Sequence, residues 1–177
     1  TSAFCWFSRC SLLALADKLL IPVLPDVMHA AIGLMVIRPV SEAAWAADLS
    51  QYLQDEDPDS FAVSPRVAAG QLLDELLDAY GKRALPALLQ ATKARLDEAN
   101  AARERGASHW WRLRESATLA LSMAARPLCK AAQQAQRRGG SPAFSPQQAF
   151  DELLLPSAAV EMPPLLRARA VCTAARF

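Results

Sequence analysis

The chain has 177 residues, of which 53% are hydrophobic and 21% charged. These proportions are typical of a globular protein and exclude an intrinsically disordered chain. The net charge of +1 provides no bulk attraction to nucleic acids or membranes. Alanine and leucine dominate and aromatic residues make up only 7%, so helix formers outnumber the β-branched residues that favour strands.

The first half of the chain is expected to form successive helices. Helical stretches run over 8–20 and 26–37, with two prolines, at 22 and 25, marking the entry to the second. Ser41 is expected to cap a third helix that ends near Gln54. A turn-rich acidic loop follows at 55–63. Ser64-Pro65 then begins a helix that ends near Gly81.

The second half continues in the same way. A helix is expected from Ala84 to about Glu104, and Gly106 ends it. The next runs from 108 or 109 to about 136, and Pro127 should kink or split it. The last two helices span 146–155 and 163–177, after a loop at 137–142. No window shows sustained strand alternation, so the fold class is all-α.

The cysteines and histidines are too few and too scattered for a metal site or a disulfide framework. We expect buried, reduced thiols and no metal from Cys5, Cys10, Cys129, Cys172, His29 and His109. The sequence contains no P-loop, no G-x-S-x-G motif and no nucleophile–base pair. We therefore expect no catalytic residue, no cofactor and no enzyme activity.

The ends and the apolar stretches also carry information. The uncharged run from Val27 to Ile37 is only about half of the roughly 20 residues that a membrane-spanning helix needs, so we expect a buried helix and no membrane insertion. The abrupt ends at Thr1 and Phe177 indicate a piece of a longer protein.

Three helices share an arginine followed by an alanine three positions later, in Arg66-x-x-Ala69, Arg114-x-x-Ala117 and Arg167-x-x-Ala170. Their spacing of about 50 residues is close to that of HEAT and armadillo units. A small residue allows a neighbouring helix to approach closely, and the arginine can bond carbonyls or acids of the adjacent repeat. We expect Ala69 and Ala117 at tight contacts, and Ala101 and Ala102 at an exposed helix end. A generic bundle with a coincidental match is the alternative.

This pattern predicts one right-handed α-solenoid of HEAT-type helix pairs. About three to four repeats are expected, in approximate units 1–40, 41–81, 82–138 and 143–177.

Two charged segments and two adjacent tryptophans are candidates for function. The acidic segment predicts either a landing site for basic cargo or a solvated connector, through Asp55, Glu56, Asp57 and Asp59. The basic stretch indicates either a contact with acidic partners or nucleic acid, or a solvated helix end, at Arg126, Lys130, Arg137 and Arg138. Trp110 and Trp111 are expected to pack within the fold, or one of them to lie at a repeat junction or on a partner surface.

Several motifs, in order, resemble a mid-chain segment of the importin-β (karyopherin) family. The first block contains Trp45-x-x-Asp48-x-x-x-Tyr52, Asp55-Glu56-Asp57-x-Asp59-x-Phe61 and Arg66-Val67-Ala68-Ala69-x-x-Leu72-Leu73. Later blocks are His109-Trp110-Trp111-Arg112-Leu113-Arg114-Glu115-Ser116-Ala117 and Leu165-Leu166-x-x-Arg169-Ala170. The resemblance covers about 31–177, and it supports repeat-packing roles for Arg66, Ala69, Trp110, Trp111, Arg114, Ala117, Arg169 and Ala170.

The resemblance implies a segment of a nuclear import receptor. Such a receptor would wrap basic cargo, such as histones or ribosomal proteins, and release it when Ran-GTP binds. It would also contact nucleoporins and shuttle between cytoplasm and nucleus, without direct nucleic-acid binding. The alternative is a non-transport HEAT or armadillo scaffold for the assembly of protein complexes.

Overall fold

The computed structural model describes the backbone of residues 2–57 and 64–177, and side chains from residue 17 onward except at 49 and 58–63. Within the described residues the secondary structure is helical and contains no strand, which confirms the all-α prediction. No single described helix is long and apolar enough to cross a membrane. Asp17–Leu34 and Pro39–Ala47 meet that criterion only as a pair, with a bend of 42° between them.

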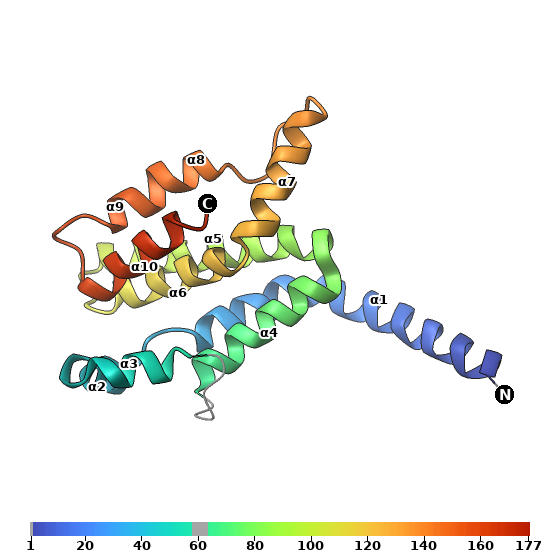
Figure 1. The fold of residues 1–177 in the computed structure, drawn as a ribbon, viewed down its shortest axis with the longest axis horizontal. Coiled ribbons are helices and arrows are strands. Elements are labelled where there is room, and N and C mark those ends of the chain that lie inside the picture. Colours follow the sequence, from blue (N-terminus) through green and yellow to red (C-terminus); the bar gives the residue numbers. More distant parts are fainter. Residues whose placement is uncertain (1, 58–63) are drawn as a thin grey trace.

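The helices follow one another with short connections (Figure 1). They are α1 (Ser2–Leu34), α2 (Pro39–Ala47), α3 (Leu49–Asp55), α4 (Pro65–Tyr80), η1 (Gly81–Arg83), α5 (Ala84–Glu104), α6 (Trp110–Met123), α7 (Ala125–Arg137), α8 (Pro146–Ala149), η2 (Phe150–Leu154), α9 (Leu155–Ser157) and α10 (Pro164–Ala174). The element η2 is a π-helical stretch that joins α8 to α9.

The helices pack as pairs in two layers. In one layer α6 lies between α4 and α10, and in the other α1 packs against α5. Across the layers α1 pairs with α4, α5 with α6, and η2 with α10. Along the chain, α2 and α3 come between the two helices of the first pair, and they lie to one side of that pair (Figure 1). This arrangement of stacked helix pairs is that of an α-solenoid.

Two prolines do not divide the first helix, contrary to expectation. Pro22 and Pro25 both lie inside α1. Each removes one backbone hydrogen bond, but the carbonyls left unpaired belong to exposed residues, where water can bond them. Leu24 and Met28 are 1% and 0% exposed in the main core, so burial of their side chains stabilises the helix across the prolines.

The expected helix from Ser41 to Gln54 is instead two helices. Pro39 begins α2, so Ser41 lies inside that helix and does not cap it. Asp48 adopts an extended conformation between α2 and α3. Its side chain accepts a hydrogen bond of 2.8 Å from the backbone N–H of Ser50 and so caps α3. A capping aspartate competes with the continuous helix because its carboxylate can satisfy a free N–H.

Other expected boundaries agree with the structure. Ser64 caps α4 by accepting a hydrogen bond of 3.1 Å from the N–H of Val67. Gly81 ends α4 at a φ of 51°, in a region that favours glycine. The helix after Gly106 is split as expected, into α6 and α7, and Pro127 lies in the first turn of α7.

Small residues allow the helices of the solenoid to approach closely. A Cβ at Gly70 of α4 would lie 3.3 Å from the Cε of Met123 on α6. Ala69 and Ala117 are 3% and 0% exposed, so a larger side chain at either position would have to displace packed neighbours. Ala102 was expected to be exposed but is 1% exposed, because the end of α5 is still packed when the chain turns at Gly106.

Candidate functional site

The acidic segment is divided between internal contacts and the surface. Asp55, the last residue of α3, accepts hydrogen bonds from the indole N–H of Trp45 at 2.8 Å and from the amide of Gln51 at 2.7 Å. Asp57 is exposed, and Asp59 lies outside the described residues. The contribution of Asp55 to cargo binding would therefore compete with its contacts inside the chain.

The fourth acid, Glu56, belongs to a buried group of alternating charges. Its Oε1 lies 2.5 Å from Nε of Arg66, and its Oε2 lies 2.7 Å from Nη2 of Arg169. Glu115 faces the same two arginines. Its Oε1 lies 2.7 Å from Nη2 of Arg66 and 2.8 Å from Nε of Arg169. We call Glu56, Arg66, Glu115 and Arg169 the four-charge cluster.

The cluster connects all three helix pairs. Arg66 is in the first turn of α4, Glu115 is on α6, Arg169 is on α10, and Glu56 directly follows α3. Arg66 also donates through Nη1 to the backbone carbonyl of Met35, just after α1. Because each guanidinium bonds two carboxylates from different elements, the cluster fixes how these elements lie relative to one another.

Opposite charges in the cluster shift the pKa values of Glu56, Arg66 and Arg169. Burial by itself would raise the pKa of Glu56, but the charges of Arg66 and Arg169 and their hydrogen bonds lower it below the usual value. Burial would lower the pKa of Arg66, and Glu115 and Glu56 together raise it instead. The pKa of Arg169 is raised in the same way. Removing one member would leave a buried charge without its counterion.

The repeated arginines do not have equivalent contacts. Arg114 donates to Oγ of Ser157 at 2.8 Å and, at 3.4 Å, to the carbonyls of the next helix pair at Glu152 and Leu153. On α10 the arginine of the sequence pattern, Arg167, donates to the carbonyl of Val160 in the preceding loop at 3.2 Å. Arg169, two positions later, makes the contacts to the other helix pairs.

A comparison with known families identifies this arrangement. A family model described as Importin-9 central HEAT repeats matches residues 20–177. The chain belongs to the importin-9 central HEAT-repeat family. The match confirms the resemblance to the importin-β family and the α-solenoid of HEAT-type helix pairs, and it places the chain in a family of nuclear transport receptors.

The other packing residues of this importin-9-type segment lie at contacts between helices. Ala170 is 1% exposed. Trp111 is buried in a second apolar cluster with Ile37, Trp45 and Leu166. Its neighbour Trp110 is half-buried on the edge of that cluster and lies under the guanidinium of Arg103, with Cζ 4.6 Å from the ring centroid. The tandem tryptophans thus join α6 to α2 and α10.

The sequence interpretation missed Glu115, which lies at the centre of the cluster. Its side chain is only 2% exposed. A signal was available, because Glu115 shares a helical face with Trp111 and Thr118, both of which are buried. A carboxylate on such a face requires a cationic partner. Only the fold identifies that partner, since Arg66 and Arg169 lie far away in sequence.

No group of His, Cys, Asp and Glu in the described part of the chain is arranged to hold a metal ion. Cys129 is half-buried, and burial raises the pKa of its thiol. Cys172 was expected to be buried but is exposed. It lies beside the exposed Val171 on the outward face of α10.

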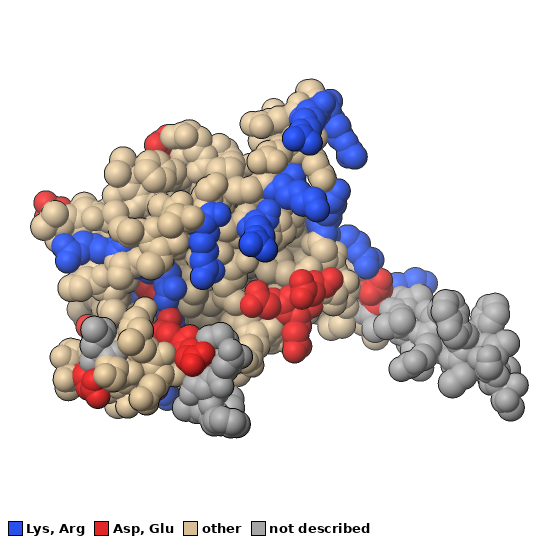
Figure 2. Space-filling model, viewed as in Figure 1, with Lys and Arg blue, Asp and Glu red and all other residues tan. Residues whose placement is uncertain are grey.

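Charges of the two signs separate on the face drawn in Figure 2. Acidic side chains gather over α4, and basic side chains lie over α7 and the end of α10. The exposed acids of α4 are Asp74, Glu75 and Asp78. The exposed bases of α7 are Arg126, Lys130 and Arg137.

Proposed function

We propose that the chain is the part of a nuclear import receptor that binds basic protein cargo, such as histones or ribosomal proteins. The acidic surface that would receive the cargo consists of Asp57 and the exposed face of α4. Family membership supports the import role. The observation that carries the proposal is a group of exposed carboxylates on α4 that, among the described residues, have no cationic side chain within ion-pair distance.

No basic side chain on α4 can neutralise these carboxylates. The helix contains a single arginine, Arg66, which is already bonded to Glu56 and Glu115. Burial and the negative charge of Asp78 raise the pKa of Asp74, and Arg176 opposes them without restoring the usual value. The lysine and arginine side chains of a basic cargo would relieve this repulsion. A cationic partner that binds α4 would therefore reduce a repulsion between carboxylates that is present in the free chain.

Release would follow when Ran-GTP binds elsewhere on the receptor. A solenoid changes shape by small rotations between neighbouring helix pairs, and an effector that favours a different shape weakens the cargo contacts. Within this proposal the receptor passes between cytoplasm and nucleus and contacts nucleoporins on the way. The four-charge cluster would keep these three helix pairs together as one unit during that change.

The test is a salt series of binding between the chain and a fluorescent core-histone dimer. The variant Asp74→Asn, Glu75→Gln, Asp78→Asn removes the acidic face of α4. We expect affinity about tenfold weaker, at roughly 0.2–1 kcal/mol for each exposed charge, and a shallower salt dependence.

A matched control removes three exposed carboxylates from other helices and loops, at Asp26, Glu104 and Glu161. This control should bind as the unmodified chain does, apart from a small uniform effect of net charge. Equal affinities and equal salt slopes in the two triple variants would show that α4 does not receive the cargo.

A second pair of variants separates the parts of the acidic segment. Asp57→Asn with Asp59→Asn should weaken cargo binding. Asp55→Asn with Glu56→Gln should instead lower the stability of the chain, because these two side chains bond Trp45 and Arg66.

A further inference from the structure

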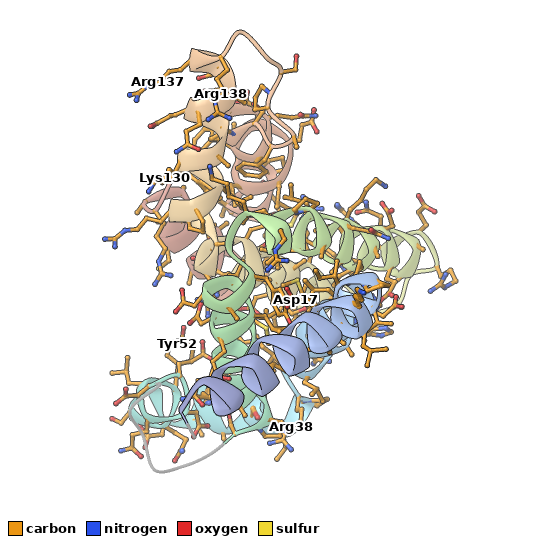
Figure 3. The ribbon with its side chains drawn as sticks, turned by 90° about the vertical axis from the view of Figure 1, so that its right-hand side faces the viewer. Asp17, Arg38, Tyr52, Lys130, Arg137 and Arg138 are labelled. Atoms are coloured by element: carbon orange, nitrogen blue, oxygen red, sulfur yellow. The ribbon has the colours of Figure 1, made fainter. Side chains whose placement is uncertain are left out.

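The basic residues of α7 form a single stripe. Arg126, Lys130 and Arg137 follow one another at i, i+4 and i+11, so they lie within about 40° of each other around the helix axis. Exposed Gln133 lies between them in the same sector. Figure 3 shows Lys130 and Arg137 projecting from the same side of α7, away from the rest of the fold.

The stripe is separate from the buried face of α7. The buried residues of α7 are Ala125, Leu128 and Ala132, which lie on the opposite face of the helix. Along this part of the chain no acidic residue occurs between Glu115 and Asp151. Among the described residues, the side chains of the stripe have no carboxylate within ion-pair distance. Three exposed cations thus have no counterion in the described part of the chain.

The basic surface continues beyond the helix. A hollow of about 470 Å³ separates Arg126 from Arg176, at the end of α10, and both arginines line it. Arg176 in turn is close enough to Asp74 of α4 to influence its ionisation. The positive surface therefore ends at a negative one, as Figure 2 shows.

This border favours one class of partner. A nucleic acid is a long polyanion, and tight binding typically uses about 6–10 phosphate contacts. The stripe offers three cations, and the carboxylates of α4 would repel a polyanion that extended past it. A short acidic segment of a protein meets neither obstacle. The stripe rises about 16 Å along the axis of α7, a length that about five residues span in extended conformation.

We propose that the basic stripe of α7 is a docking surface for a short acidic segment of a partner protein. The carboxylates of that segment pair with Arg126, Lys130 and Arg137. This surface is separate from the proposed cargo surface, which uses the carboxylates of α4. If binding of the acidic segment to α7 is lost, binding of basic cargo to α4 can therefore still be measured, and the reverse also holds.

The test measures binding of a fluorescent glutamate-rich peptide to the 177-residue chain by anisotropy. The variant Arg126→Gln, Lys130→Gln, Arg137→Gln should bind the peptide about tenfold more weakly and lose most of its salt dependence. Binding of the histone dimer should not weaken in this variant. Circular dichroism checks that the helical content is unchanged.

The control removes three exposed bases from α1, the α1–α2 connection and the loop after α5, at Lys18, Arg38 and Arg105. It changes net charge equally and should keep peptide affinity within about twofold. Three results would overturn the proposal: no peptide binding by the unmodified chain, equal losses in both triple variants, or tighter binding of a single-stranded oligonucleotide of equal charge than of the peptide.

Discussion

Replacing Glu115 with glutamine should destabilise the chain far more than a comparable change at the surface. The substitution keeps the shape of the side chain and removes its charge. Glu115 accepts three hydrogen bonds from guanidinium groups, at 2.9, 2.7 and 2.8 Å. Without its charge, Arg66 and Arg169 share only Glu56 as a counterion, and one positive charge in the buried cluster is left without a partner.

The magnitude follows from burial. Removing one partner of a buried ion pair costs about 3–5 kcal/mol, and for a chain of this size each kcal/mol lowers the Tm by roughly 2–4 °C. We therefore expect a decrease of about 6–20 °C. The matched surface pair is Lys93 and Asp97, 2.7 Å apart with side chains 76% and 61% exposed. Asp97→Asn should cost only about 0.3–0.5 kcal/mol.

Thermal and urea denaturation, followed by circular dichroism, measure both variants. A double replacement of Arg66 and Glu115 by apolar residues provides a further comparison. It should be less destabilising than Glu115→Gln alone, because it leaves fewer unpaired buried charges. Similar small losses for Glu115→Gln and Asp97→Asn would refute the reasoning, since they would mean that the cluster is not desolvated in solution.

Three further predictions concern stability. Because the pKa of Glu56 is lowered in the fold, its stabilisation is full above its usual value of 4.5 and decreases as pH falls through the folded pKa; Glu56→Gln should flatten the acid limb of a stability–pH curve. The pKa of Asp74 is raised in the fold, so its ionised form lowers the stability of the chain above the folded pKa. Asp74→Asn should therefore raise stability at neutral pH by a few tenths of a kcal/mol, about the size of the repulsion in a like-charge helix pair. Ala69→Leu should cost about 1–3 kcal/mol in chemical denaturation by overpacking the buried side of α4, and the exposed Ala79 should accept leucine with little change.

The sequence predicted those features of the fold that depend on local chemistry. Ser64 and Pro65 begin α4, and Gly81 ends it, because capping and positive φ are properties of a few adjacent residues. Pro22 and Pro25 misled the prediction. Their local preference is to end a helix, but the energy gained by burying Leu24 and Met28 in the core is not visible in the neighbouring sequence.

The candidate site was only partly predictable for the same reason. The run of acids from Asp55 to Asp59 indicated a single charged loop, yet Glu56 is drawn into the fold by Arg66 and Arg169. That pairing joins residues far apart in the chain, so no local pattern contains it. The basic residues of α7 were visible in the sequence, but only the fold shows that the face they share is exposed.

Hydrogen–deuterium exchange of the chain with and without bound histone dimer would locate the cargo surface. We expect bound cargo to slow exchange in α4, from Pro65 to Tyr80, and at the acidic segment that ends α3. We expect no slowing in α5, which lies in the other layer. Protection confined to α1 and α5, or unchanged exchange in α4 at saturating cargo, would contradict the proposal that this acidic face binds basic cargo.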